Sequence, residues 1–147
     1  MNMKKNKKIE ALKNTAEMWK WLAEHPLCSK RDYFNFKKIS LADRPQCLCY
    51  CCQYALEKFV IANKVNIEDI KSMNKDICCF CPIPDWQGDE ENNPSCEAHH
   101  SPYKIWLGTI NDYEDGEEDV EKLKKFAKEA ALDIVELASE QLTIISK

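Results

Sequence analysis

The sequence contains little glycine and no long apolar run, and each absence excludes a class of protein. Only three glycines occur among the 147 residues, so no glycine-rich loop is available to cradle a phosphate group. No apolar stretch approaches the roughly 18 residues that identify a membrane-spanning helix. The basic start of the chain is not followed by an apolar segment, so we expect no signal peptide, no membrane association and a cytoplasmic location.

A net positive charge is also lacking, because acidic residues outnumber lysine and arginine. The formal net charge is -4, whereas broad binding of a nucleic-acid backbone needs clustered lysine and arginine. Two segments run against this balance: the lysine-rich stretch from Lys4 to Lys13, and the mixture of aromatic and basic residues over 30–38. Such a mixture can stack bases and contact phosphates. Nucleic-acid binding is therefore a less favoured alternative, and solvated basic faces are the favoured interpretation.

Apolar spacing predicts a mainly α-helical single domain over residues 1–147, with a helix at each end. Within 6–25, apolar side chains recur at intervals of three and four residues. Asn6 is the predicted N-cap, and Pro26 forces a stop because the residue before a proline is pushed out of the helical conformation. The predicted buried positions are Ile9, Leu12, Ala16, Trp19 and Ala23.

The same spacing runs through residues 116–146 and resembles a heptad seam. Asp115 followed by Glu118 resembles a capping box at the start of this helix. We expect it to pack antiparallel against the N-terminal helix, and its extra length can cover the middle of the chain or form a homodimer. Its predicted buried positions are Val120, Leu123, Ala127, Ala130, Ile134, Leu137, Gln141 and Ile144.

The middle of the chain is predicted to consist of short elements and loops. A helix is expected from Cys52 to about Asn63, and a short helical segment follows at 66–70. Residues 27–46 are predicted to be irregular. Residues 82–115 are predicted to be a loop region, which contains several prolines, asparagines and acidic residues.

Nine cysteines carry the strongest chemical signal in the sequence. Two Cys-x-x-Cys pairs, Cys49 with Cys52 and Cys78 with Cys81, are separated by 25 residues, and the gap within each pair lets both thiolates face one metal ion. Zinc takes four such ligands in a tetrahedron. An odd number of cysteines in a reducing compartment favours metal ligands over disulfides. We therefore predict a structural Zn(II) module over 47–81 with these four cysteines as ligands.

The remaining thiols and nearby histidines leave alternatives open. Three cysteines are out of phase with the pairs and are expected to be packed thiols or ligands in a shifted register, namely Cys47, Cys51 and Cys79. An alternative ligand group, which could replace a cysteine or form a second site, consists of Cys96, His99 and His100.

A zinc ion closed by four thiolates has no open position for a substrate, so we expect no enzymatic activity. The enzyme alternative is a metal-dependent nuclease that uses His99 or His100. A further alternative is the binding or sequestering of a small nucleotide signal by stacking side chains. The candidate residues for that pocket are Trp86, His100, Tyr103 and Trp106.

Several motifs together resemble a group of small cysteine-rich, zinc-binding phage and prophage proteins. They are the two cysteine pairs, the Pro82 that follows the second pair, and Ser101-Pro102-Tyr103-x-x-Trp106, with a Lys/Glu/Ala-rich final helix. The resemblance implies the same four metal ligands, a phage origin and the cytoplasm of the host.

We expect a non-enzymatic, zinc-stabilised phage accessory protein that binds a host protein. By analogy with other small phage proteins, antagonism of host defence is the expected role. The acidic segments 85–91 and 112–119 are the expected contact faces.

Overall fold

The computed structural model describes residues 3–70, 73–89, 95–116 and 119–146, and within them it contains helices and no strand. This agrees with the mainly α-helical class expected from the apolar spacing. The α-helices are α1 (Met3–Glu24), α2 (Lys30–Phe36), α3 (Tyr50–Asn63), α4 (Lys75–Cys78), α5 (Pro102–Glu114) and α6 (Val120–Ile145). Short 3-10 turns connect them at η1 (Leu41–Asp43), η2 (Gln46–Leu48) and η3 (Ile67–Asp69). None of the described helices combines the length and the apolar character that a membrane span requires.

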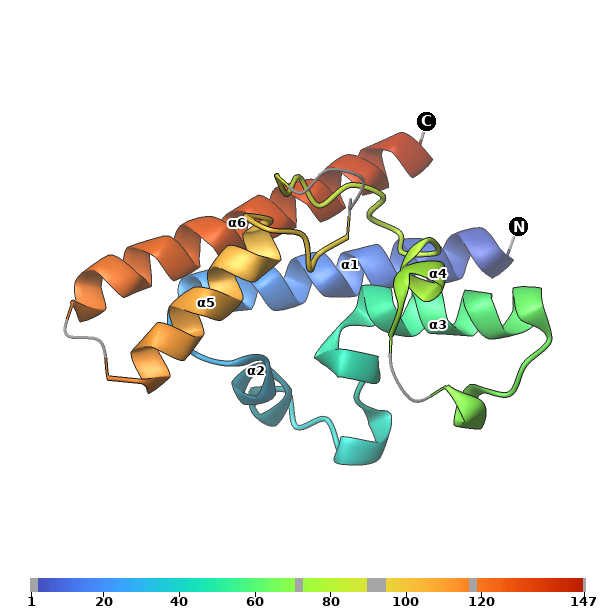
Figure 1. Cartoon of the computed structure of the whole chain (residues 1–147), viewed down its shortest axis with the longest axis horizontal. Helices are drawn as coiled ribbons and strands as arrows, with labels where there is room; N and C mark the ends of the chain where they lie inside the picture. The colour runs from blue at the N-terminus through green and yellow to red at the C-terminus, as the bar shows by residue number, and fades with distance from the viewer. Residues whose placement is uncertain (1–2, 71–72, 90–94, 117–118, 147) are drawn as a thin grey trace.

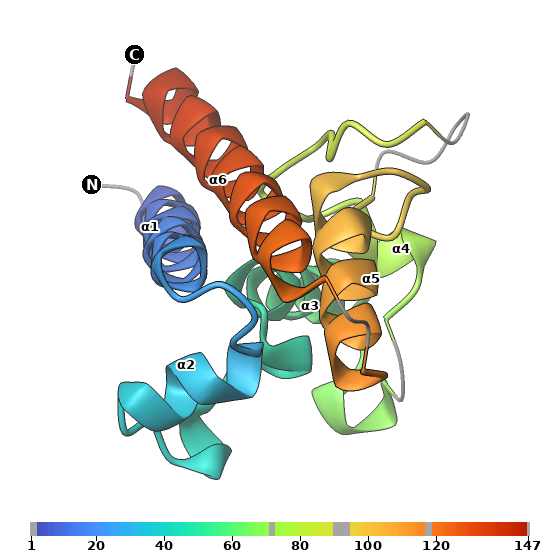
Figure 2. The same ribbon diagram turned by 90° about the vertical axis from the view of Figure 1, so that its left-hand side faces the viewer.

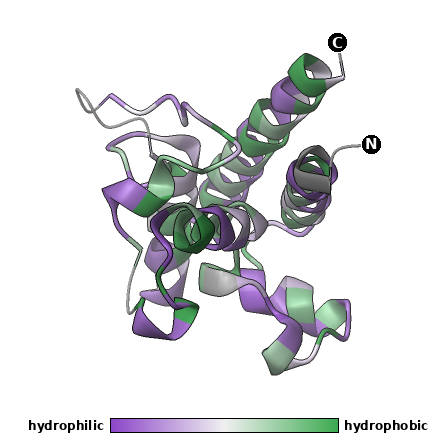
Figure 3. Ribbon diagram, turned by 90° about the vertical axis from the view of Figure 1, so that its right-hand side faces the viewer, coloured by the Kyte–Doolittle hydropathy of each residue, from purple (hydrophilic) through white to green (hydrophobic). Residues whose placement is uncertain are grey.

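The terminal helices α1 and α6 lie side by side and antiparallel, as predicted (Figure 1). Their contact buries Leu12 and Trp19 of α1 together with Ile134 of α6. Four alanines on the inner face of α6 allow a close approach of the two helices, and Figure 3 shows apolar and polar segments alternating along the helix that ends at the C-terminus. These alanines are Ala127, Ala130, Ala131 and Ala138.

The buried stripe of α6 changes register toward its end. Ile144, predicted to be buried, is 60% exposed, and Leu142 and Ile145 pack against the core instead. An α-helix has 3.6 residues per turn, so a face that is spaced at 3.5 residues drifts by about 20° per heptad. The predicted positions from Leu123 to Leu137 are buried, and the drift explains why the last predicted position is not.

The predicted caps of the terminal helices are wrong. The N-cap of α6 is Asp119, whose carboxylate accepts a hydrogen bond from the Lys122 amide at 3.1 Å, whereas Asp115 ends α5. Glu118, the other half of the predicted capping box, lies outside the described residues. Asn6 lies within α1, which begins three residues earlier, at Met3.

Helices α2 and α5 correct the prediction that 27–46 is irregular and 82–115 a loop region. Ser29 and Asp32 form a reciprocal capping box at the start of α2. Ser101 caps α5 by accepting from the Lys104 amide at 3.2 Å, and Pro102 occupies the first turn, where a missing N–H costs nothing. The tertiary contacts of α5 stabilise it, because it packs along α6 (Figure 2).

A second, smaller apolar cluster joins α3 to α4. Its buried members are Ala55 and Leu56 of α3 and Ile77 of α4. The short helix α4 is capped by Asn74, whose side chain accepts from the Ile77 amide at 3.0 Å. α3 also packs against α1, and this contact joins the cluster to the terminal helix pair.

Candidate functional site

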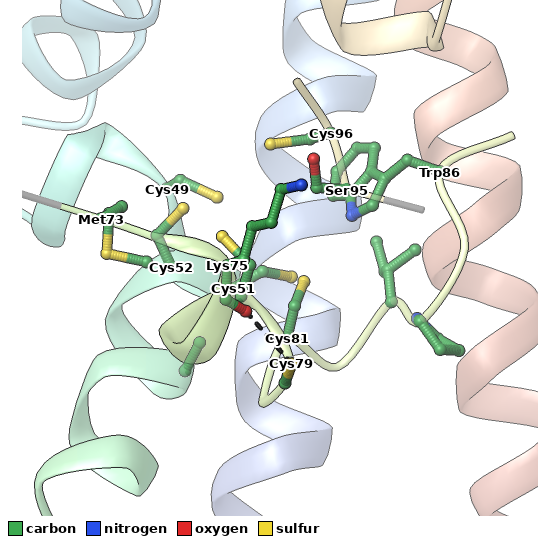
Figure 4. Close-up of a pocket in the computed structure, with 14 residues that line it drawn as sticks. Cys49, Cys51, Cys52, Met73, Lys75, Cys79, Cys81, Trp86, Ser95 and Cys96 are labelled. Atoms are coloured by element: carbon green, nitrogen blue, oxygen red, sulfur yellow. Dashed lines mark hydrogen bonds between the residues drawn. The ribbon is translucent and has the colours of Figure 1, made fainter. Parts of the chain in front are cut away.

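Seven of the nine cysteines line one cavity of about 370 Å³ at the N-terminal end of α3. Figure 4 shows the cavity walls, which come from α3, from α4 and from the segments around 81–86 and 95–96. Apolar side chains, among them Met73, Ile83 and Trp86, also line the cavity. The seven cysteines are Cys49, Cys51, Cys52, Cys78, Cys79, Cys81 and Cys96. Residues far apart in the sequence therefore place their thiols around a common space.

The first cysteine segment is positioned by the start of α3. Cys49 is the N-cap residue with an extended backbone, and the helix then directs Cys51 inward, where it is 1% exposed. The Cys51 Sγ lies 3.2 Å from the Thr15 Oγ1 of α1, and the Thr15 hydroxyl is also 2.8 Å from the Ala11 carbonyl oxygen. This polar contact fixes the start of α3 against α1.

Thiol–thiol hydrogen bonds shift the acidities within this segment in opposite directions. Contact with the thiols of Cys51 and Cys52 holds the pKa of Cys49 well below its ordinary value. The pKa of Cys52 is raised by hydrogen bonds with Cys47 and Cys49 and by burial. A hydrogen bond with Cys52 in turn lowers the pKa of Cys47 to about 7. Low-pKa thiols bind metal readily at neutral pH because the thiolate is the ligand.

The second cysteine segment surrounds the end of α4. The pKa of Cys81 is lowered, chiefly by a hydrogen bond with Cys51, so the two segments touch through their thiols. Burial and the neighbouring Cys81 raise the pKa of Cys78. Cys79 is exposed, and its thiol donates to the Lys75 carbonyl oxygen at 3.1 Å.

Cys96 enters the cavity from a third segment. The Ser101 hydroxyl donates to the Cys96 carbonyl at 2.5 Å and thereby ties this residue to the start of α5. Burial raises the pKa of the Cys96 thiol, and the neighbouring Cys49 and Cys81 raise it further. In Figure 4 the Cys96 side chain points toward the side of the cavity that carries Cys49.

Two lysines bring positive charge to the thiols. The Lys30 ammonium donates to the Cys47 carbonyl oxygen at 3.1 Å and to the Tyr103 hydroxyl at 3.2 Å. Burial lowers the pKa of Lys30, but Tyr103 and the thiols of the first cysteine segment more than offset it, so the pKa is raised overall. Lys75 lines the cavity, and Figure 4 shows its side chain reaching across it.

The cavity brings together all four predicted zinc ligands, Cys49, Cys52, Cys78 and Cys81. Across the parts of the chain that the structure describes, no three His, Cys, Asp or Glu side chains already form a group that could hold a metal ion. A cysteine has one side-chain torsion, so rotation about its Cα–Cβ bond can turn a thiol from a neighbouring thiol toward an ion.

The alternative ligand group is divided by the fold. Cys96 lines the cavity, whereas His99 and His100 are exposed. The His100 Nδ1 lies 2.7 Å from a carboxylate oxygen of Asp89, and the two histidine rings lie 3.8 Å apart.

The residues of the candidate nucleotide pocket also lie in different surroundings. Trp86 is 3% exposed and forms part of the cysteine cavity. Trp106 packs edge-on against Trp19 with ring centroids 4.8 Å apart, and Tyr103 packs against the same ring at 6.1 Å. His100 lies at the surface beside Asp89.

The expected contact faces are described in part. Asp85 and Asp89 are exposed, and Glu90 and Glu91 of the first acidic segment lie outside the described residues. At the end of α5, residues 112–116 are exposed, and residues 117–118 lie outside the described residues. Among the basic segments, Tyr33 and Phe34 within 30–38 are buried, and the side chains of Lys4 and Lys5 are not described.

The sequence prediction left Cys51 outside the favoured ligand set, although its thiol is central in the structure. Its position could have been inferred, because Cys51 and Ala55 are four residues apart and share the buried face of α3. The contact with Thr15 is tertiary and carries no local signal.

No family model, curated protein or solved structure shows a significant match to this chain. The function is therefore argued from the cavity and its thiols.

Proposed function

We propose that this is a non-enzymatic, zinc-stabilised protein that acts by binding another protein. The observation that carries the zinc assignment is the collection of seven thiols from three segments around one cavity. Thiolates are the preferred ligands of structural zinc, and a set of four closes the coordination sphere. Closed coordination leaves no position for a substrate, which supports a structural role.

Zinc would supply stability where apolar packing is sparse. The cluster between α3 and α4 has three buried apolar members, Ala55, Leu56 and Ile77. A structural zinc ion contributes on the order of 10–16 kcal/mol in small zinc-binding peptides at pH 7. An ion held by Cys49, Cys52, Cys78 and Cys81 would join the start of α3 to the end of α4.

The partner assignment rests on exposed acidic residues and on the resemblance to small phage proteins. Asp112, Glu114 and Asp115 at the end of α5 are exposed and next to the half-exposed ring of Tyr113. An aromatic ring within a charged rim is typical of a protein-binding surface. The proposed partner is a host protein with a basic surface, and antagonism of host defence is the proposed consequence.

The zinc assignment is tested by metal analysis of the full chain. We expect at least one zinc ion per chain, and strong chelation should lower the melting temperature. Cys28→Ser is the matched control, because Cys28 lies beside Asp32 and away from the cavity, and this variant should keep its zinc. A metal-free protein that melts at an unchanged temperature would overturn the assignment.

The partner assignment is tested by charge reversal in a pull-down from host lysate. The triple variant Asp112→Lys, Glu114→Lys, Asp115→Lys should lose a stoichiometric partner that the unmodified chain retains. The control variant Glu136→Lys, Glu140→Lys changes exposed charge on α6 and should retain it. Equal capture by both variants would remove the α5 surface from the proposal.

One observation favours a second candidate function. The cavity volume of about 370 Å³ falls within the range of about 300–1,000 Å³ typical of small-molecule sites, and its walls include Trp86. The alternative is a nucleotide signal held against that ring. A thermal-shift panel of cyclic nucleotides, run on the zinc-loaded chain, should show stabilisation if this alternative holds and none if the cavity is a metal site.

A further inference from the structure

The cavity contains more thiols than one zinc ion can use. A tetrahedral ion takes four ligands, whereas seven cysteines line the space and the Cys47 thiol contacts Cys52 at its edge. Packed thiols do not need such an arrangement, because a buried cysteine normally behaves as a small apolar side chain. The surplus therefore calls for a chemical explanation.

The thiol contacts form a continuous chain. The Cys47 thiol forms a hydrogen bond with the Cys52 thiol, and Cys52 forms one with Cys49. Cys49 in turn forms a hydrogen bond with Cys51, and Cys51 forms one with Cys81. Cys49 stands at the middle of this chain, with two thiols on either side of it. A thiolate sulfur has more than one lone pair, so a thiolate in that position can bind two metal ions at once.

Two further thiols, those of Cys96 and Cys78, can be assigned to the two halves of this series of thiol contacts. Cys96 lies near Cys49 and Cys81, which places it with the second half. Cys78 lies near Cys81 and, more weakly, near Cys47. The second half already supplies four thiols with Cys49, Cys51, Cys81 and Cys96, so Cys78 is available as the fourth ligand of the first half. Cys79 is the one cavity cysteine that we leave unassigned, because its thiol donates to the Lys75 carbonyl oxygen.

We propose that the cavity binds two soft divalent d10 ions, zinc in the cell, that share a thiolate bridge at Cys49. This inference rests on the proposed zinc binding and extends it from one ion to two. The first ion takes Cys47, Cys49, Cys52 and Cys78. The second ion takes Cys49, Cys51, Cys81 and Cys96.

The surroundings suit the charge of such a centre. Two divalent ions and seven thiolates carry a net charge of about -3, which needs nearby cations or hydrogen-bond donors. Lys30 lies at Cys47 and close to Cys49 and Cys52, and Lys75 reaches across the cavity. The Thr15 hydroxyl, 3.2 Å from Cys51, can turn from the Ala11 carbonyl to donate to a Cys51 thiolate.

The test uses the full chain loaded with ¹¹³Cd(II), which takes the same thiolate ligands as zinc and has a nuclear spin. Native mass spectrometry should show two cadmium ions per chain. The ¹¹³Cd spectrum should contain two resonances that are split by scalar coupling to one another, because coupling between the metals is transmitted through a shared sulfur.

The outcomes distinguish failure of the zinc assignment from failure of the two-ion centre. No bound cadmium would overturn both this inference and the zinc assignment. One ion per chain would leave the zinc assignment intact and overturn the two-ion centre. Two uncoupled resonances would overturn the bridge at Cys49.

Variants locate the bridge. Cys49→Ser should remove the coupling and at least one ion, whereas Cys47→Ser should weaken only the first ion. Cys28→Ser is the control and should retain two coupled resonances. The coupling in the unmodified chain decides the question even if Cys49→Ser fails to fold.

Discussion

The terminal helix pair and the cysteine region of this molecule are stabilised by different means. α1, α5 and α6 share a continuous apolar core that includes Trp19 and Trp106. The region of α3 and α4 has its own small apolar cluster, and the space beside it is lined with thiols. The first region is stabilised by buried apolar surface, whereas for the second we propose that a bound metal ion supplies part of the stability.

The largest effect is expected from truncating the shared core. Trp19→Ala removes a ring that is 2% exposed and packs edge-on against Trp106. We expect a loss of about 3–5 kcal/mol in the free energy of unfolding, measured by urea denaturation. The neighbouring exposed Lys20→Ala should change it by less than about 0.5 kcal/mol. A loss for Trp19→Ala no larger than that of the control would contradict a core centred on this ring.

A smaller and more local effect is expected in the cysteine region. Ile77→Ala truncates a fully buried side chain, but its neighbours Phe59, Val60 and Phe80 are only partly buried and can close the gap. We expect a loss of about 2 kcal/mol. Hydrogen exchange should show the loss in α3 and α4 and leave α1 and α6 unchanged. Equal loss of protection in all four helices would show that the two regions unfold as one.

Removing the Ser101 link between the two regions is expected to reduce stability by less than either core substitution. Ser101→Ala removes the cap of α5 and the hydrogen bond to the Cys96 carbonyl. We expect the free energy of unfolding, measured by thermal denaturation, to fall by about 1–2 kcal/mol. Ser101→Thr retains the hydroxyl and should recover part of it. Matching stabilities for the alanine variant and the unmodified chain would remove this link from the account.

The last effect is a pH dependence that is absent at neutral pH and emerges only in alkaline solution. Burial, with Glu17 and Tyr50 adding to it, raises the pKa of Tyr33 to about 12. A tyrosine in an unfolded chain titrates near about 10. The stability that Tyr33 provides is therefore intact below about pH 10 and lost as pH rises from there toward 12.

Tyr33→Phe separates the contribution of the Tyr33 hydroxyl from the titration of the cysteines and lysines. The difference in urea midpoint between the unmodified chain and the variant should be constant below about pH 10 and shrink or change sign above it. A difference that is independent of pH up to about 12 would contradict the burial of this hydroxyl.

The two regions also differ in how well the sequence predicts them. The terminal helices follow from apolar spacing, since Leu12, Trp19, Ala127 and Ile134 all lie in the core. α5 was missed although its start carries a strong signal, Ser101 followed by Pro102. The surrounding prolines and acidic residues favour a loop in the sequence. The helix is stabilised by packing of its inner face, which includes Trp106, against α6, and no local pattern shows this contact.

The cysteine region could be predicted in kind and only partly in detail. Spacing alone pointed to Cys49, Cys52, Cys78 and Cys81, and all four line the cavity. The proximity of Cys96 depends on the path of the chain before α5, which no local pattern specifies. The order of contacts among the thiols likewise depends on how α3 and α4 meet.

Hydrogen exchange with and without metal tests the central claim most directly. The zinc-loaded chain and the chelated chain would be compared at the same pH and temperature. We predict that removing metal lowers protection in α3 and α4 by more than about tenfold and changes α1 and α6 by less than about threefold. Equal protection of α3 and α4 in the two samples would contradict a metal-dependent cysteine region.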